Sequence, residues 1–281
     1  MIRKMTQKTI KTIGVVGAGT MGRGIAQVFA LYNYPVVLVD TKEEILRGAL
    51  ELIKERTAHE LWDKVKNLIE TSTDLEKLNG CGLVIEAVFE DMAVKKELFR
   101  KLGGICGKDA LIATNTSALS INELSSAVDN PSRFAGMHFM NPPKVMKLVE
   151  VIKGDKTSPE TVDAIVDVAK KLEKVAAIAN DSPGFISNRL LFALIGEALK
   201  LLESGVAKKG DIDTVMKSGM NHPMGPIELA DFIGLDICKE IMQTLYEELK
   251  DERYKPTKKL EDLVKAGKLG RKTKEGFYKY G

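Results

Sequence analysis

The chain has 281 residues, enough for about two domains. Hydrophobic residues make up 44% and charged residues 29%, as in an ordinary globular protein, and a net charge of +3 argues against a dedicated nucleic-acid surface. No apolar stretch has the length of a membrane span or of a signal-peptide core. The three dispersed cysteines and three histidines show neither a disulfide framework nor metal-ligand spacing, so we expect a cytoplasmic protein without a metal.

Short apolar runs alternate with helical patterns along the first two thirds of the chain. Strands are expected at 12–16, 35–40, 81–88, 110–115, 133–139, 147–152 and 175–179. Helices are expected after Gly22, at 43–70 (one or two charged helices), at 92–102 and at 158–172. Strands that are apolar throughout and separated by helices indicate a mostly parallel sheet covered on both faces, which is the doubly wound, Rossmann-like α/β class.

The pattern changes near residue 182. Ser182 is a candidate helix N-cap with Pro183 at the first helical position, and the run 185–202 is apolar on nearly every face. Such a helix must be buried between domains or between subunits. Residues 211–266 give further helical patterns without a strand signal. We therefore predict one domain over 1–182 and an all-helical domain over 183–281.

The run GVVGAGTMGRGIA holds three glycines, Gly17, Gly19 and Gly22, with the spacing G-x-G-x-x-G. An apolar strand precedes them, a helical pattern follows, and Asp40 closes the next strand. This context predicts a dinucleotide site, with the pyrophosphate at the helix N-terminus and Asp40 on the ribose hydroxyls. A carboxylate there would repel a 2′-phosphate, which favours NAD over NADP, although nearby Lys42 leaves that choice open.

His138 and Glu150 lie in two consecutive apolar runs. A lone carboxylate is costly to bury, so Glu150 needs a partner, and His138 is the nearest candidate. The carboxylate would fix the tautomer of the imidazole and favour its charged form. Such an imidazole could take the proton of an alcohol while hydride leaves the same carbon. A purely structural His–Glu pair is the alternative.

Several motifs in register carry a resemblance to a known family. They are GVVGAGTMGRGIAQ, EAVFED, NTSALSI, HFMNPP with KLVEVI, DSPGFISNRLL, HPMGPIELADFIGLD and GRKTKEGFYKY. From about residue 10 to the end, the chain resembles the 3-hydroxyacyl-CoA dehydrogenases, most closely the bacterial and archaeal 3-hydroxybutyryl-CoA dehydrogenases. The resemblance implies an NAD-binding domain, a helical domain for substrate binding and homodimerisation, and the NAD-dependent interconversion of (S)-3-hydroxyacyl-CoA and 3-oxoacyl-CoA.

The resemblance also implies roles for individual residues. His138 would be the general base, held and charged by Glu150, while Ser117 and Asn188 would bind the substrate oxygens. Ser117 could equally form a turn, and Asn188 a hydrogen bond between helices. Contacts with NAD carry over to Gly17, Gly19, Thr20, Met21, Gly22, Asp40, Glu90, Lys95, Asn115, Ser117, Asn141 and Lys272. Glu90 and Lys95 could also be an ordinary surface pair.

The segment between Asp40 and Thr73 departs from the family, because a helical hairpin that contributes to the coenzyme A site looks shortened. The segment still carries Lys42, Arg47, Lys54, Arg56, Lys64 and Lys66. We expect Lys54 to be a substrate contact, although amphipathic helices also carry solvated lysines with no such role. A dehydrogenase of a free hydroxy acid or sugar acid, and an NAD-binding sensor without turnover, are the alternatives for the whole chain.

Overall fold

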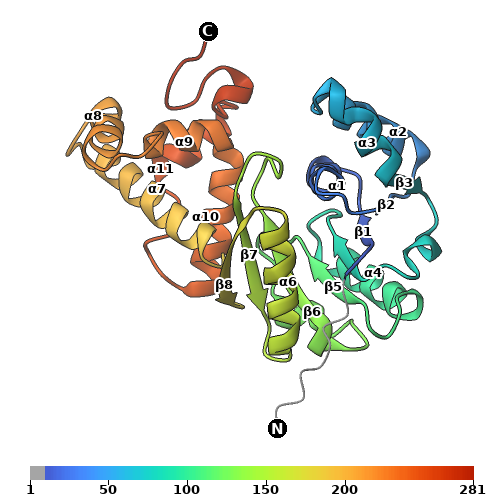
Figure 1. Cartoon of the computed structure of the whole chain (residues 1–281). Helices are drawn as coiled ribbons and strands as arrows, with labels where there is room; N and C mark the ends of the chain where they lie inside the picture. Colours follow the sequence, from blue (N-terminus) through green and yellow to red (C-terminus); the bar gives the residue numbers. More distant parts are fainter. Residues whose placement is uncertain (1–9) are drawn as a thin grey trace. The chain divides into compact units, whose positions relative to one another are not determined.

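The computed structural model describes residues 10–281, which divide into two compact units (Figure 1). The first unit ends at Ser182, and the second comprises Pro183–Gly281. Within the described part of the chain, all named strands belong to the first unit. The predicted class, an α/β domain followed by an all-helical one, is confirmed.

The first unit is built on one eight-stranded sheet of order β3-β2-β1-β4-β5-β6-β7-β8. Its strands are β1 Ile13–Val16, β2 Val36–Val39, β3 Ile69–Ser72, β4 Leu83–Glu86, β5 Leu111–Thr114, β6 Phe134–Phe139, β7 Leu148–Lys153 and β8 Val175–Asn180. Neighbouring strands are parallel except β6 and β7, which run antiparallel. The carboxyl ends of β1, β2, β4, β5 and β6 therefore share one edge. The strand order reverses between β1 and β4, and sheets of this class bind ligands at such a crossing.

One strand was not predicted. Residues 43–70 were expected to be helical, and they form α2 (Glu43–Glu55) and α3 (His59–Leu68), but β3 begins at Ile69. Only Ile69 of this strand is buried, and the remaining residues are polar. An edge strand with one buried side chain has no apolar run that would reveal it in the sequence. Its strand conformation is defined by pairing with β2, in which Val36 lies opposite Ile69.

Helices cover both faces of the sheet. Helices α1 (Thr20–Leu31) and α6 (Pro159–Lys171) contribute to one large core with the strands. On the other face, Phe99 of α4 (Met92–Ile105) packs edge-on against Phe134, with ring centroids 5.0 Å apart. Helix α6 begins where the sequence indicates, because the Ser158 hydroxyl accepts a hydrogen bond from Thr161 N.

The second unit packs helices around its own core of buried apolar side chains, which includes Phe192, Leu199 and Met242. Its helical elements are α7 Ser187–Glu203, α8 Lys209–Thr214, η3 Val215–Gly219, α9 Pro226–Ile233, α10 Leu235–Leu249, α11 Lys258–Lys265 and η4 Arg271–Thr273. The predicted cap is wrong, since α7 begins at Ser187. Gly184 and Phe185 have φ of +71° and +48°, and a right-handed helix cannot pass through them.

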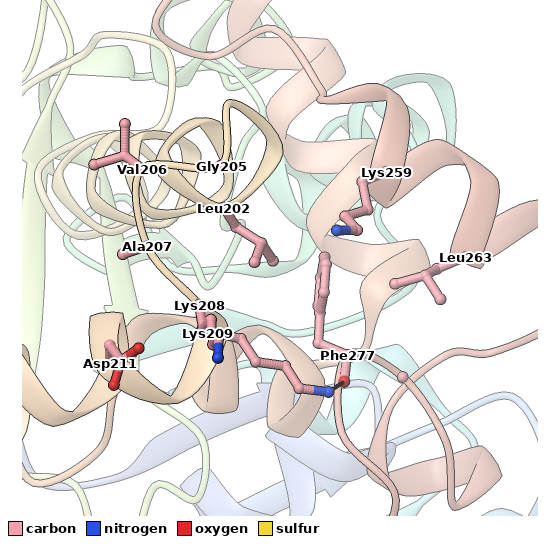
Figure 2. Close-up of a pocket in the computed structure, with 11 residues that line it drawn as sticks. Leu202, Gly205, Val206, Ala207, Lys208, Lys209, Asp211, Lys259, Leu263 and Phe277 are labelled. Atoms are coloured by element: carbon pink, nitrogen blue, oxygen red, sulfur yellow. Dashed lines mark hydrogen bonds between the residues drawn. The ribbon is translucent and has the colours of Figure 1, made fainter.

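The second unit also contains a cavity of about 760 Å³, shown in Figure 2. Apolar side chains such as Leu202 and Phe277 line it together with three lysines, and Lys209 Nζ donates a hydrogen bond to the carbonyl of Phe277. None of the residues that the sequence predicts as functional lines this cavity. Among residues 10–281, no helix is long and apolar enough to cross a membrane.

Candidate active site

The glycine turn joins β1 to α1 and has the geometry that a pyrophosphate requires. Gly17 has φ +96°, and a Cβ on Gly22 would lie 1.6 Å from the carbonyl oxygen of Gly17. A Cβ on Gly19, by contrast, would meet nothing within 4 Å, so the backbone is open to a ligand there. Helix α1 begins at Thr20 without a side-chain cap, which leaves N–H groups of its first turn for an anion. The turn therefore fits a dinucleotide.

Asp40 follows β2 at the same edge of the sheet. Its Oδ2 accepts a hydrogen bond from Ala18 N at 2.7 Å, and its Oδ1 accepts one from Thr41 N at 2.7 Å. The carboxylate thus ties the glycine turn to the end of β2. Each carboxylate oxygen has a further lone pair, and the side chain is only half-buried, so it can still accept a ribose hydroxyl.

A buried row of charges lies behind the ends of β4 and β5. Lys95 is 1% exposed, and its Nζ lies 2.5 Å from Glu86 Oε1 and 3.0 Å from Glu90 Oε2. Glu86, the last residue of β4, is fully buried and also accepts a hydrogen bond from Thr114 Oγ1 at 2.7 Å. Glu86 was not among the predicted functional residues. The sequence signal for it is an acid in an apolar run, the same signal that predicts a buried partner for Glu150.

Glu90 connects this row of charges to the loop that follows β5. Its Oε1 accepts hydrogen bonds from Thr116 Oγ1 at 2.5 Å and from Ser117 N at 2.7 Å. Burial alone would raise the pKa of Glu90, but Lys95 and the hydrogen bonds from Thr116 and Ser117 lower it below its ordinary value. Glu90 and Lys95 are therefore no ordinary surface pair.

Ser117, His138 and Glu150 form a hydrogen-bonded row. His138 Nδ1 lies 2.9 Å from Glu150 Oε2, and His138 Nε2 lies 3.1 Å from Ser117 Oγ. The antiparallel register places His138 of β6 directly opposite Glu150 of β7. His138 is 6% exposed and Glu150 is fully buried. An ionised carboxylate can only accept, so Nδ1 carries the proton and Nε2 offers a lone pair toward Ser117.

The remaining predicted residues fall into different surroundings. Asn115 is buried, and its Oδ1 accepts a hydrogen bond from Phe139 N at 2.9 Å, which joins the ends of β5 and β6. Asn141 is exposed in the loop after β6. Asn188 and Lys272 belong to the second unit. Asn188 lies on α7, and Lys272 lies in η4, where its Nζ pairs with both carboxylate oxygens of Asp236 at 2.6 Å.

Three other predicted positions lie on the surface of helices or at their starts. Thr20 begins α1, and its hydroxyl accepts a hydrogen bond from Arg23. Met21 is half-buried against the core of the first unit, and Lys54 is exposed on α2. Among residues 10–281, no group of three or more His, Cys, Asp or Glu side chains is arranged as metal ligands.

The first unit therefore combines an open glycine turn, an acceptor for ribose and a buried carboxylate–imidazole pair near one edge of a sheet. This combination is typical of oxidoreductases that move hydride with a nicotinamide dinucleotide and handle the accompanying proton with a side chain.

Comparisons with known proteins define the class further. Residues 12–182 match the model of the NAD-binding domain of 3-hydroxyacyl-CoA dehydrogenase, and residues 184–280 match the model of its C-terminal domain. The chain therefore belongs to the 3-hydroxyacyl-CoA dehydrogenase family, as its motifs predicted.

Relatives and solved structures agree with the domain models. A probable 3-hydroxybutyryl-CoA dehydrogenase of Deinococcus radiodurans is 46% identical over 95% of this chain and 99% of that protein. The mitochondrial hydroxyacyl-coenzyme A dehydrogenase of Homo sapiens is 42% identical over 96% of this chain and 91% of its own. The crystal structure of (S)-3-hydroxybutyryl-CoA dehydrogenase PaaH1 from Ralstonia eutropha matches with a TM-score of 0.92 and 40% identity, over 97% of this chain and 100% of that one.

Proposed function

We propose that the protein interconverts (S)-3-hydroxybutyryl-CoA and acetoacetyl-CoA with NAD as the cofactor. The observation that carries this proposal is the row Ser117–His138–Glu150, which lies beside the carboxyl ends of β5 and β6 at the edge that also bears the glycine turn. The names of the relatives from Deinococcus radiodurans and Ralstonia eutropha support the four-carbon acyl group.

His138 is the proton carrier in this proposal. NAD would supply the acceptor for the hydride that leaves C3 of the substrate, and His138 Nε2 takes the proton of the hydroxyl on that carbon. Glu150, bonded to Nδ1 at 2.9 Å, compensates the positive charge that then forms on the ring. In the reductive direction the protonated ring returns the proton to the ketone oxygen.

Ser117 orients the substrate in this proposal. The Ser117 hydroxyl is 3.1 Å from Nε2, so a substrate oxygen bound at Nε2 would be within its reach. The backbone of Ser117 is fixed by Glu90, which keeps the hydroxyl in place without a contribution from the substrate. The role of Asn188 of α7 as a substrate contact stays a prediction.

A direct assay separates this activity from the oxidation of a free hydroxy acid. With NADH, the protein should reduce acetoacetyl-CoA with a kcat/KM at least 100-fold above that for free acetoacetate, because only the thioester can use contacts along coenzyme A. The decrease in NADH absorbance measures both reactions. A preference for free acetoacetate would refute the proposal, and no turnover with either would favour an NAD-binding sensor. NADPH in parallel tests whether Asp40 excludes the 2′-phosphate.

We also propose that the protein is a homodimer that associates through its helical unit. This unit exposes several large apolar side chains, among them Leu190 at 68%, Val206 at 72% and Met220 at 62%. Exposed apolar side chains favour association, because a second chain can remove them from water. Light scattering at micromolar concentration should give twice the mass of one chain, and a monomer mass would refute the proposal. The cytoplasmic location stays a prediction.

A further inference from the structure

Lys174 is a buried lysine whose ammonium group binds backbone carbonyls. It lies between α6 and β8 and is 8% exposed, and its Nζ donates hydrogen bonds of 2.7 Å to the carbonyl oxygens of Pro143 and Met146. Among residues 10–281, no carboxylate lies within ion-pair distance of this ammonium group. Burial lowers the pKa of Lys174, because its charged form loses solvation. A buried charge without a counter-charge is costly, so the two carbonyl groups that it binds point to its role.

The backbone of Lys174 is fixed by the end of α6. Glu173 there has φ +54°, and Lys174 N donates a hydrogen bond to Ala169 O at 3.0 Å, which is the capping motif of a helix that ends in a left-handed residue. The Glu173 carboxylate also accepts a hydrogen bond at 3.0 Å from the hydroxyl of Tyr32, the C-cap residue of α1. Both helices therefore fix the turn from which the side chain of Lys174 extends.

The two carbonyl groups belong to the loop 140–147, which joins β6 to β7. The loop follows the strand of His138 and leaves the sheet at the edge that bears the glycine turn. Its Pro143 packs on α1 so closely that a Cβ on Gly24 would lie 2.9 Å from the proline ring. Asn141, a predicted cofactor contact, is exposed at the start of the loop. The loop thus connects the strand of His138 with the helix that follows the glycine turn.

The same loop also contacts the end of α2. Lys144 Nζ donates a hydrogen bond to the carbonyl of Arg56 at 2.6 Å. Burial and the guanidinium of Arg56 lower the pKa of Arg23 on α1, so Arg56 lies near α1 as well. Because Lys144 is exposed and Lys174 is buried, water competes with the hydrogen bond of Lys144 more than with those of Lys174. Lys174 therefore supports the loop more firmly than Lys144 does.

We infer that Lys174 is a positioning residue for the cofactor, because it holds the loop 140–147 in the conformation that NAD requires; the kinetic test of this inference rests on the proposed function. Pro143 and Met146 lie at the two ends of one tight turn, so loss of both hydrogen bonds frees that turn. A site that populates its binding conformation for only a fraction of the time loses apparent affinity by that fraction. His138 is held separately by the ladder with β7, so its chemistry does not depend on Lys174.

A lysine that only stabilises the fold is the competing explanation. Its ammonium group would then satisfy two buried carbonyl groups with no consequence for the cofactor. Its removal would lower the free energy of unfolding and leave the Michaelis constants of the folded protein unchanged. The two explanations therefore differ in KM for NADH.

Methionine at this position keeps most of the length of the side chain and removes its donors. Lys174→Met should raise KM for NADH roughly fivefold to tenfold, with kcat and KM for acetoacetyl-CoA within about twofold of the parent. Lys171→Met removes an exposed lysine of α6 and is the matched control, with no change in either KM expected. Lys174→Arg, whose guanidinium group can donate to both carbonyl groups, should keep KM for NADH within about threefold of the parent.

Limited digestion with trypsin reports on the loop without turnover. Cleavage after Lys144 or Lys147 requires local opening of the loop, so it should be roughly fivefold faster in Lys174→Met, and NADH should slow it in the parent. The exposed Lys156 lies between β7 and α6, at the opposite edge of the sheet because β7 runs antiparallel to β6. Cleavage after Lys156 is the internal reference and should not respond to NADH.

The outcomes are distinct. An unchanged KM for NADH in Lys174→Met would overturn the inference, as would a rise confined to KM for acetoacetyl-CoA. If Lys174→Met does not fold, the shorter and uncharged Lys174→Gln takes its place under the same criteria. In the parent, equal protection by NADH after Lys144 and after Lys156 would also overturn the inference. Selective protection by NADH without reduction of acetoacetyl-CoA would refute the proposed function and leave this inference supported.

Discussion

Replacing His138 with alanine should lower kcat for acetoacetyl-CoA reduction roughly 100-fold or more, the usual contribution of a positioned acid–base group. His138 Nε2 is 3.1 Å from Ser117 Oγ, and Nδ1 is 2.9 Å from a fully buried carboxylate. Alanine leaves no side-chain group there that can hold a proton. The steady-state decrease of NADH absorbance at saturating substrates measures the change.

The companion measurements show whether this loss is chemical. NADH binding to the alanine variant, followed by fluorescence, should be within about twofold of the parent, because the glycine turn and Asp40 are unchanged. Glu150→Gln keeps an acceptor for Nδ1 but removes the charge that compensates the protonated ring, so its kcat should fall while NADH binding is kept. Near-normal turnover of His138→Ala would exclude the proton-carrier role, and an unchanged kcat of Glu150→Gln would argue against the charge pairing.

Replacing Lys95 with methionine should destabilise the fold by about 3–5 kcal/mol, the cost of leaving a buried charge without its partner. Lys95 is 1% exposed, and the carboxylate of Glu86 beside it is fully buried. Turnover should fall as well, because Glu90 loses the ammonium group behind it and Glu90 fixes the backbone of Ser117. Urea denaturation gives the free energy of unfolding, and the NADH assay gives the turnover.

Two matched variants make this second prediction specific. Lys101→Met breaks an exposed pair with Glu97 on the same helix and should cost less than about 0.5 kcal/mol. Lys95→Met/Glu86→Gln removes both buried charges and should regain part of the lost stability, since the uncompensated carboxylate is gone. Equal costs for Lys95→Met and Lys101→Met would contradict the role of the buried row of charges.

The elements that the sequence predicted well are those whose burial leaves a pattern. Apolar runs located seven of the eight strands of the sheet. Five of them, β1, β2, β4, β5 and β6, are buried along their whole length, and strands buried on both faces need apolar residues throughout. The edge strand β3 was not predicted, because its pairing with β2 defines it and its composition does not. The helix start at Ser182 was wrong because the left-handed backbone of Gly184 and Phe185 is a property of the fold, and Phe185 gives no local sign of it.

The site was predictable where a single residue contradicted its surroundings. Glu150 in an apolar run required a partner, and the antiparallel register supplies His138 as that partner. Glu86 is likewise a buried acid in an apolar run, but it was not predicted as a functional residue. The grouping of Arg23, Arg56 and Lys144 could not be predicted, because these residues are distant in sequence and only packing between α1, α2 and the loop after β6 brings them together.

His138 and Glu150 face each other across β6 and β7, so the effect of an insertion or deletion depends on whether it falls between the strands or within one of them. The connection between β6 and β7 can change length during evolution or engineering without altering which way either side chain faces, because the ladder of the two strands sets their alignment. One extra residue inside β7, before Glu150, would instead turn that carboxylate to the opposite side of the sheet. A change of length should therefore be tolerated more readily in the connection than inside the strand.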